Sequence, residues 1–205
     1  MRNTSSLDPK AAFFHVIDPH RWLAASGCNW NLAGAPASGE LKARAHELLP
    51  NVDVMILNAL LLHARCLIKF YLKRAEKPTD IHLGVFLKRV SLEKHCRKKL
   101  EEYEQPIEVH LLHLTEWRDP GHRKIHGVGK HANKHRPDWN LEAAGIVEAI
   151  LDALRWVSDH AGNWQRPFRD LHQASRTRYL DTHSVWPKHL GEEDDVASYL
   201  SGLGL

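Results

Sequence analysis

The chain contains little cysteine, and its three thiols are far apart in the sequence. Cys28, Cys66 and Cys96 are the whole set among 205 residues, and none belongs to a Cys-x-x-Cys pair. A disulfide scaffold, a thiolate zinc knuckle and a thioredoxin-type redox site are therefore all poor interpretations. We expect the chain to fold around an ordinary apolar core.

A long uninterrupted apolar run is also missing. The first 22 residues contain no stretch that resembles a secretory signal. The longest apolar stretch, 54–72, is interrupted by Asn58, His63, Arg65 and Lys69. These residues argue against a transmembrane span. We therefore expect a cytoplasmic, bacterial protein with no membrane partner.

Alternating apolar and polar residues, the mark of a half-buried strand, are not sustained anywhere, whereas helical spacing is clear. The strongest segment follows Asn51, a good capping residue, and continues without Gly or Pro until Pro78. Two stripes of mainly apolar residues follow the helical spacing. The first consists of Ile56, Leu60, His63, Leu67 and Phe70, and the second of Met55, Ala59, Leu62 and Cys66. Two such stripes predict a central helix that is buried nearly all round.

Further helices are predicted over residues 39–49, over a charged segment after Ser91, from Pro106 onward, over 141–160 and near the C-terminus. The first 37 residues are rich in Ala, Gly, Pro and Asn, and they are interpreted as an irregular arm. We therefore predict an all-α antiparallel helical bundle over 38–161, with irregular arms at 1–37 and 162–205.

Histidine is the outlier in composition. The chain has 16 histidines, where ordinary usage of about 2% predicts roughly four or five. Four of them fall in the basic segment 122–136, together with five Lys or Arg residues and no carboxylate. The formal net charge of the whole chain is only +3, so this local cluster is more informative than the overall charge.

Four interpretations of the basic segment stay open. Its cations could contact phosphate oxygens, with amides of the Gly127–Gly129 turn close by. His131 could exchange a proton in catalysis. The pairs His122/His126 and His131/His135 could bind a metal ion, although neighbouring cations repel one and no carboxylate or thiolate joins them. The segment could also be a solvated connection between helices.

Two stretches resemble the HEPN-like family of small bacterial helical-bundle proteins. The first is Asn58-Ala-Leu-Leu-Leu-His-Ala-Arg-Cys-Leu-Ile-Lys-Phe70, which is similar to the family's long second helix. The second runs from Ile125 through His131 and Arg136 to Trp139, which is similar to the entry of the family's last helix. The segment Asp80–Phe86 matches an acidic-aromatic connector between them.

The resemblance implies an antiparallel bundle, often dimeric, and in active members metal-independent cleavage of RNA. It would make His131 the acid/base, with Arg123 and Arg136 stabilising phosphate charge and Asn133 orienting one of them. Seven residues separate Arg123 from His131, so this assignment depends on position before the last helix. The remaining expected phosphate contacts are His122, Lys124, His126, Lys130, Lys134 and His135.

The function predicted from the sequence is therefore interaction with RNA or nucleotides, with possible endoribonuclease activity in a bacterial defence or toxin system. No cofactor and no metal are expected, and the partner is a second copy of the chain. The alternative is a non-catalytic helical scaffold that dimerises through the bundle. Within the central helix, His63 and Arg65 are expected to be structural, with Glu116 or Asp80 as the acidic partner of Arg65.

Overall fold

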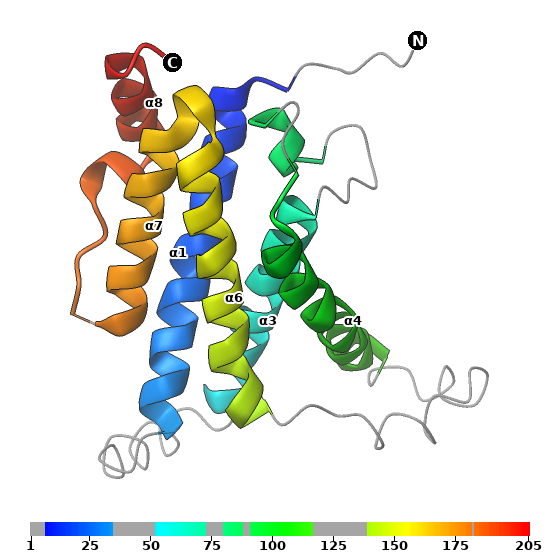
Figure 1. Cartoon of the computed structure of the whole chain (residues 1–205). Helices are drawn as coiled ribbons and strands as arrows, with labels where there is room; N and C mark the ends of the chain where they lie inside the picture. The colour runs from blue at the N-terminus through cyan, green and yellow to red at the C-terminus, as the bar shows by residue number, and fades with distance from the viewer. Residues whose placement is uncertain (1–6, 35–51, 73–79, 88–90, 117–138, 182) are drawn as a thin grey trace.

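The computed structural model describes residues 7–34, 52–72, 80–87, 91–116, 139–181 and 183–205, and over these residues the protein is entirely helical (Figure 1). Six α-helices pack together in the described part, which contains no strand, so the all-α prediction is confirmed. They are α1 (Pro9–Gly34), α3 (Val52–Tyr71), α4 (Lys94–Glu116), α6 (Trp139–His160), α7 (Gln165–Leu180) and α8 (Glu193–Gly202). Short 3-10 turns lie at η2 (Leu83–Val85), η4 (Gly162–Trp164) and η5 (Lys188–Leu190).

Helix α1 lies at the centre of the assembly and contacts α3, α6, α7 and α8. It runs in the same direction as α7 (Figure 1). Two contacts show this: Phe13 near the start of α1 packs edge-on against Phe168 near the start of α7, and Gly27 lies against Tyr179 near the end of α7. An added Cβ at Gly27 would lie 2.9 Å from a methyl carbon of Val147 on α6. A glycine at this position therefore allows the three helices to approach closely.

The prediction of an irregular N-terminal arm was wrong, since α1 is a helix of 26 residues that even includes Pro19. Its Ala, Gly, Pro and Asn content is unfavourable for a helix. However, Phe13, Ile17 and Leu23 are fully buried in the common core. Burial of this apolar face outweighs the weak local preference, as it does for most helices in folded proteins.

The C-terminal segment is also more regular than expected. Helix α7 covers 16 residues that were interpreted as part of an irregular extension. Its proline, Pro167, lies in the first turn, where the missing N–H costs no helical hydrogen bond. Phe168 and Leu171 then bury fully against the core. The terminal helix α8 was predicted and is confirmed, with three acidic residues in its first turn.

Helix α4 continues through Pro106, where two separate helices were predicted. The proline has no N–H to donate to the carbonyl of Glu102, so one helical hydrogen bond is lost. The helix continues because Leu100 and Ile107, on either side of the proline, are both fully buried. Toward its C-terminal end, α4 leans away from the other helices (Figure 1).

Helix α3 is present as predicted, but the prediction that it is buried nearly all round was wrong. Leu60, Leu67 and Phe70 of the first stripe are buried, and Leu61, Ala64 and Ile68 beside them are buried as well. The second stripe is different, because Met55 is 62% exposed and Leu62 is 49% exposed. Only one side of α3 therefore belongs to the core.

Candidate functional site

The residues singled out from the sequence as catalytic or phosphate-binding all lie outside the described residues. This applies to the catalytic candidates His131, Arg123, Arg136 and Asn133 and to the whole basic segment 122–136. The short helix expected over 39–49 lies outside them too. The candidate sites on the described part of the chain are an exposed face of α3 and a pocket between α4 and α6.

The exposed face of α3 is a continuous line of apolar residues, here called the α3 stripe: Met55, Ala59, Leu62 and Cys66. The successive spacings of four, three and four residues keep all of them on one side of the helix. Cys66 is exposed and Ala59 is partly exposed. At about 100° per residue, the stripe lies opposite the buried side of α3 that carries Leu57 and Ala64.

One flank of the α3 stripe contacts α1. The imidazole of His63 stacks on the indole of Trp22, with ring centroids 6.4 Å apart and 15° between the planes. Burial lowers the pKa of His63, and the nearby Asp18 carboxylate only partly opposes this shift. The His63 ring is therefore neutral at pH 7 and adds an apolar surface beside Trp22, which is itself 54% exposed.

The other flank contacts α4 through ion pairs. The guanidinium of Arg65 and the ammonium of Lys69 each lie 3.4 Å from the carboxylate of Glu108. The described acidic partner of Arg65 is thus Glu108, where the sequence suggested Glu116 or Asp80. The single carboxylate of Glu108 therefore offsets part of the positive charge beside the α3 stripe, which is itself uncharged.

Val54–Tyr71 is the one span among the described residues that is long and apolar enough to cross a membrane. A core helix of a helical bundle meets the same criterion, and 44% of this span is buried inside the protein. Its apolar character therefore results from two opposite surfaces, the core side and the α3 stripe.

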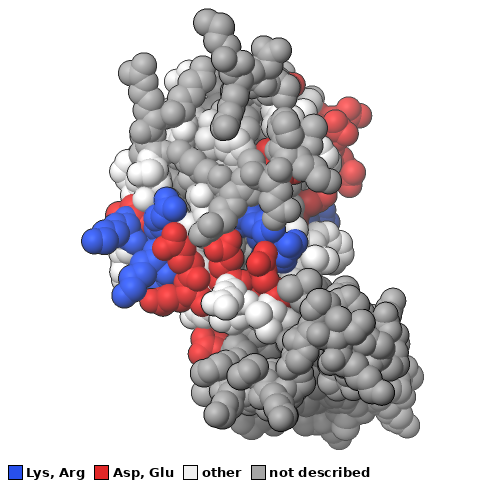
Figure 2. All heavy atoms as spheres, turned by 90° about the vertical axis from the view of Figure 1, so that its right-hand side faces the viewer, with Lys and Arg blue, Asp and Glu red and all other residues white. Residues whose placement is uncertain are grey.

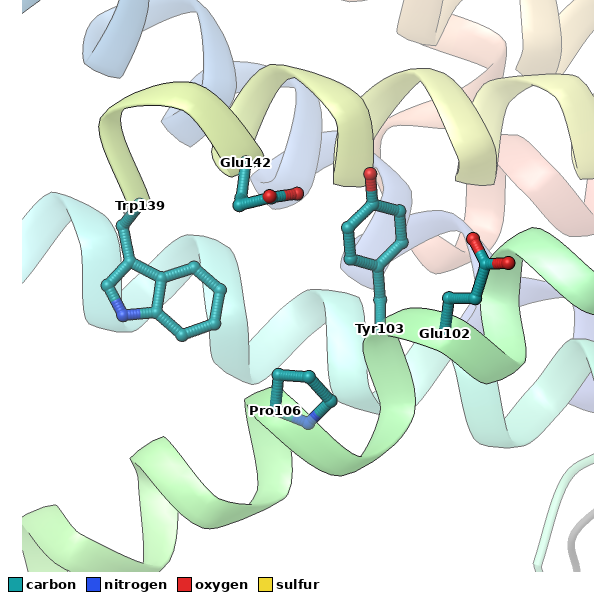
Figure 3. Close-up of a pocket in the computed structure, with 5 residues that line it drawn as sticks. All are labelled: Glu102, Tyr103, Pro106, Trp139 and Glu142. Carbon is teal, nitrogen blue, oxygen red and sulfur yellow. The ribbon is translucent and has the colours of Figure 1, made fainter. Parts of the chain in front are cut away.

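The pocket lies between α4 and the first turns of α6 (Figure 3). Its lining residues are Glu102, Tyr103, Pro106, Trp139 and Glu142, and its volume is about 260 Å³. Trp139 is buried and forms one wall. In Figure 3 the Glu142 side chain lies between the rings of Trp139 and Tyr103.

Tyr103 and Glu142 form a hydrogen-bonded pair in this pocket. The phenol donates to the carboxylate, and burial first and the Glu142 charge second raise the pKa of Tyr103. The arrangement depends on Gly145, since a Cβ there would lie 2.5 Å from the Tyr103 hydroxyl oxygen. A glycine inside a helix is unfavourable, and this close approach explains its presence.

A third polar feature lies in the core itself, where Nε2 of His20 is 2.8 Å from the hydroxyl of Tyr71. His20 is only 1% exposed. Burial, and to a smaller extent the charge of His172, lower the pKa of His20 to about 3. Its Nδ1 has no hydrogen-bond partner among the described residues. His20 is therefore a neutral core residue that sequence inspection did not single out.

A polar contact attaches α8 to α7. The hydroxyl of Tyr199 donates to the carboxylate of Asp170 at 2.5 Å. Burial raises the pKa of Tyr199 strongly, and the hydrogen bond and the charge of Asp170 add to the shift. The ring of His189 lies 4.7 Å from that of Tyr199 and covers the contact. This cluster has the features of a structural attachment.

Charges of both signs are interspersed on the face that carries α4, as far as the structure describes it (Figure 2). Arg97 pairs with Glu101 and Lys98 with Glu102 along the helix, at 3.0 and 3.8 Å. A surface of mixed sign does not attract a polyanion strongly. No group of three or more metal-ligating side chains comes together within the described residues.

A scan against protein-family models and searches of curated proteins and of solved structures found no match to this chain.

Proposed function

We propose that the protein is an all-α interaction protein that pairs with a second copy of itself through the α3 stripe. The observation that carries this proposal is the large exposure of Met55 and Leu62 on the side of α3 opposite the core. Large apolar side chains that line up on one exposed face are typical of an interaction surface, whereas scattered ones are not.

The residue sizes along the stripe favour a second copy as the partner. In an antiparallel two-fold pairing of two α3 helices, Met55 meets the partner's Cys66 and Leu62 meets the partner's Ala59. Each layer then combines a large side chain with a small one, which packs two helices closely. A two-fold axis requires such self-complementarity, because the same patch serves both protomers.

The parallel alternative packs less well. It would place Leu62 against Leu62 and Ala59 against Ala59, so that wide and narrow layers alternate along the seam. The 4-3-4 spacing of the stripe is the spacing of a helix–helix seam in either direction. Size complementarity therefore selects the antiparallel register.

The flanks support an interface of moderate strength. Exposed Trp22 on α1, whose ring lies against His63, adds apolar surface beside the stripe. The stripe itself spans 11 residue steps, or about 16 Å at 1.5 Å per residue. A seam of four residues over this length buries less surface than the about 800 Å² per partner of a standard-size interface, so we expect a dimer that dissociates at micromolar concentration.

Sedimentation velocity over a concentration series tests the proposal. The wild-type protein is expected to shift from monomer to dimer with rising concentration. Leu62→Glu should stay monomeric, because a two-fold interface would bury two unpaired carboxylates. The control is Val185→Glu, since Val185 is 90% exposed and lies between α7 and α8. A wild-type protein that stays monomeric at about 200 μM, well above the micromolar concentrations at which we expect the dimer to dissociate, or a Leu62→Glu variant that dimerises, contradicts the proposal.

Cysteine cross-linking tests the register. In the antiparallel pairing, Met55→Cys places its thiol opposite the partner's Cys66, so mild oxidation should link two chains. The wild-type thiols of Cys66 would lie about 16 Å apart along the seam, too far for the roughly 7 Å that a disulfide spans. Removing Cys66 from the Met55→Cys variant should abolish the cross-link. Wild-type dimers linked through Cys66 would instead indicate the parallel register.

A second candidate function, suggested by the HEPN-like resemblance, is binding of RNA or nucleotides through the basic segment 122–136, with cleavage of RNA as its catalytic form. It is supported by nine cationic or titratable side chains without a carboxylate in fifteen residues. The test incubates total RNA with the wild type, with His131→Ala and with His95→Ala, whose histidine is exposed on α4.

Loss of cleavage in His131→Ala alone would support catalysis by His131. Cleavage that survives in this variant would remove the catalytic assignment. If no variant cleaves, binding is measured over a salt series. About five phosphate contacts predict an affinity that falls steeply with rising salt, and a flat profile would exclude phosphate binding.

A further inference from the structure

The pocket between α4 and α6 has the wrong charge for the phosphate chemistry suggested by the sequence. Two of its five lining residues, Glu102 and Glu142, are acidic, and none is basic. Its other lining residues are two aromatic side chains and a proline. An anion would be repelled here, so the ligand class must be looked for among cations.

Glu142 is the group in the pocket that is best placed to bind a cation. One carboxylate oxygen is needed to accept the hydrogen bond from the Tyr103 hydroxyl. An ionised carboxylate has about four acceptor positions on two oxygens, so further acceptor positions are left. The Tyr103 contact also orients the carboxylate between the rings of Tyr103 and Trp139 (Figure 3).

Glu102 contributes less, because it lies on the far side of Tyr103 from Trp139 (Figure 3). Its carboxylate is 3.8 Å from the ammonium of Lys98, and both side chains are largely exposed. The other nearby cation, Lys99, is 3.1 Å from Asp152. The negative charge of Glu142 therefore dominates inside the pocket.

The remaining walls suit an apolar stem that carries a charge. Trp139 and Pro106 offer apolar surface, and aromatic rings attract cations electrostatically. A carboxylate beside two aromatic rings thus combines a charge-assisted hydrogen bond with cation–π contact. The volume of about 260 Å³ is below the roughly 300–1,000 Å³ of drug-sized sites, and it suits a group as small as one side chain.

We propose that this pocket binds a small organic cation, namely an ammonium or guanidinium group on an alkyl stem, with Glu142 as its counter-charge. The inference is independent of dimerisation, because the pocket lies between α4 and α6 and the α3 stripe does not line it.

Isothermal titration calorimetry on the full chain tests the proposal with butylguanidinium, butylammonium and N-butylurea. N-butylurea is a neutral molecule of nearly the same shape as butylguanidinium. Loss of a charge-assisted hydrogen bond lowers binding affinity by about tenfold or more. We therefore expect the two cations to bind at least tenfold more tightly than the urea. Equal affinity for the urea, or no binding of either cation at millimolar concentration, overturns the proposal.

Two substitutions on α6 locate the binding. Glu142→Gln keeps the shape of the side chain and removes its charge, and it should weaken butylguanidinium at least tenfold. Glu148→Gln is the matched control, because Glu148 is an exposed residue of the same helix that does not line the pocket. It should leave the affinity within about twofold. Wild-type affinity in Glu142→Gln would contradict the assignment.

If Glu142→Gln does not fold, as judged by circular dichroism, Glu142→Asp replaces it. Aspartate keeps the charge, but its side chain is shorter by one methylene group, so the carboxylate lies farther from the ligand. This variant should therefore still weaken the binding of butylguanidinium. A further titration with N-acetyl-arginine methylamide distinguishes the sources of the cation. Binding of this peptide-like arginine indicates a protein side chain as ligand, whereas binding of butylguanidinium alone indicates a free small cation.

Discussion

The buried histidine of α1 gives the bundle a defined sensitivity to acid. His20 is 1% exposed and accepts a hydrogen bond from Tyr71 when its Nε2 is unprotonated. In that neutral form the ring proton is on Nδ1, so a second proton would go to Nε2, which could then no longer accept the hydrogen bond from Tyr71. The nearby charge of His172 also disfavours a cationic ring. The folded state therefore keeps His20 neutral, with a pKa of about 3.

The unfolded chain has no such constraint, and its His20 titrates near pH 6.5. Below that pH the unfolded state binds a proton that the folded state does not bind until about pH 3. The free energy of unfolding must therefore fall as the pH is lowered from about 6.5 toward 3. Integrated between pH 7 and pH 5, this one group accounts for a loss of about 2 kcal/mol.

Urea unfolding at pH 7 and pH 5, followed by circular dichroism at one protein concentration, measures this effect. His20→Gln keeps an amide near the Tyr71 hydroxyl but cannot be protonated. Its loss of stability between the two pH values should be smaller than that of the wild type by about 2 kcal/mol. His15→Gln, at an exposed position of the same helix, should lose as much as the wild type. The reasoning is refuted if His20→Gln also loses as much.

Three further predictions concern the packing. Gly145→Ala should lower the melting temperature although alanine favours helices, because its Cβ would lie 2.5 Å from the Tyr103 oxygen; adding Tyr103→Phe should restore most of the loss, and no restoration would mean that the clash is not the cause. Tyr199→Phe removes the hydrogen bond to Asp170, so amide exchange in α8 should accelerate by about tenfold or more while exchange in α6 changes less. Phe13→Ala should destabilise the protein by about 3–5 kcal/mol in urea unfolding, because a fully buried ring is lost; a loss under about 1 kcal/mol would contradict its place in the core.

Local spacing of apolar residues was enough to predict α3, α6 and α8, because an amphipathic period is a property of neighbouring residues. It was not enough for α1 and α7. The composition of α1 is unfavourable, and its stability depends on Phe13 and Ile17, which are buried against other helices. The proline of α4 was likewise interpreted as a boundary, since the burial of Leu100 and Ile107 on both sides of it is a tertiary fact.

One candidate site could be found from the sequence alone, and another only from the packing of the helices. The basic segment 122–136 was found by composition alone, and its role stays a prediction because it lies outside the described residues. The pocket could not be found in this manner, because Tyr103 and Glu142 belong to different helices and only their packing brings them together.

The sequence by itself determined that the chain is helical and which residues of α3 form its two apolar stripes. Only the tertiary structure decided which stripe enters the core. Both stripes have similar hydrophobicity, and no local rule separates them. The contacts of α3 with α1, α4 and α6 bury the stripe through Leu60 and leave Met55 and Leu62 exposed. That asymmetry creates the surface on which the proposed dimer depends.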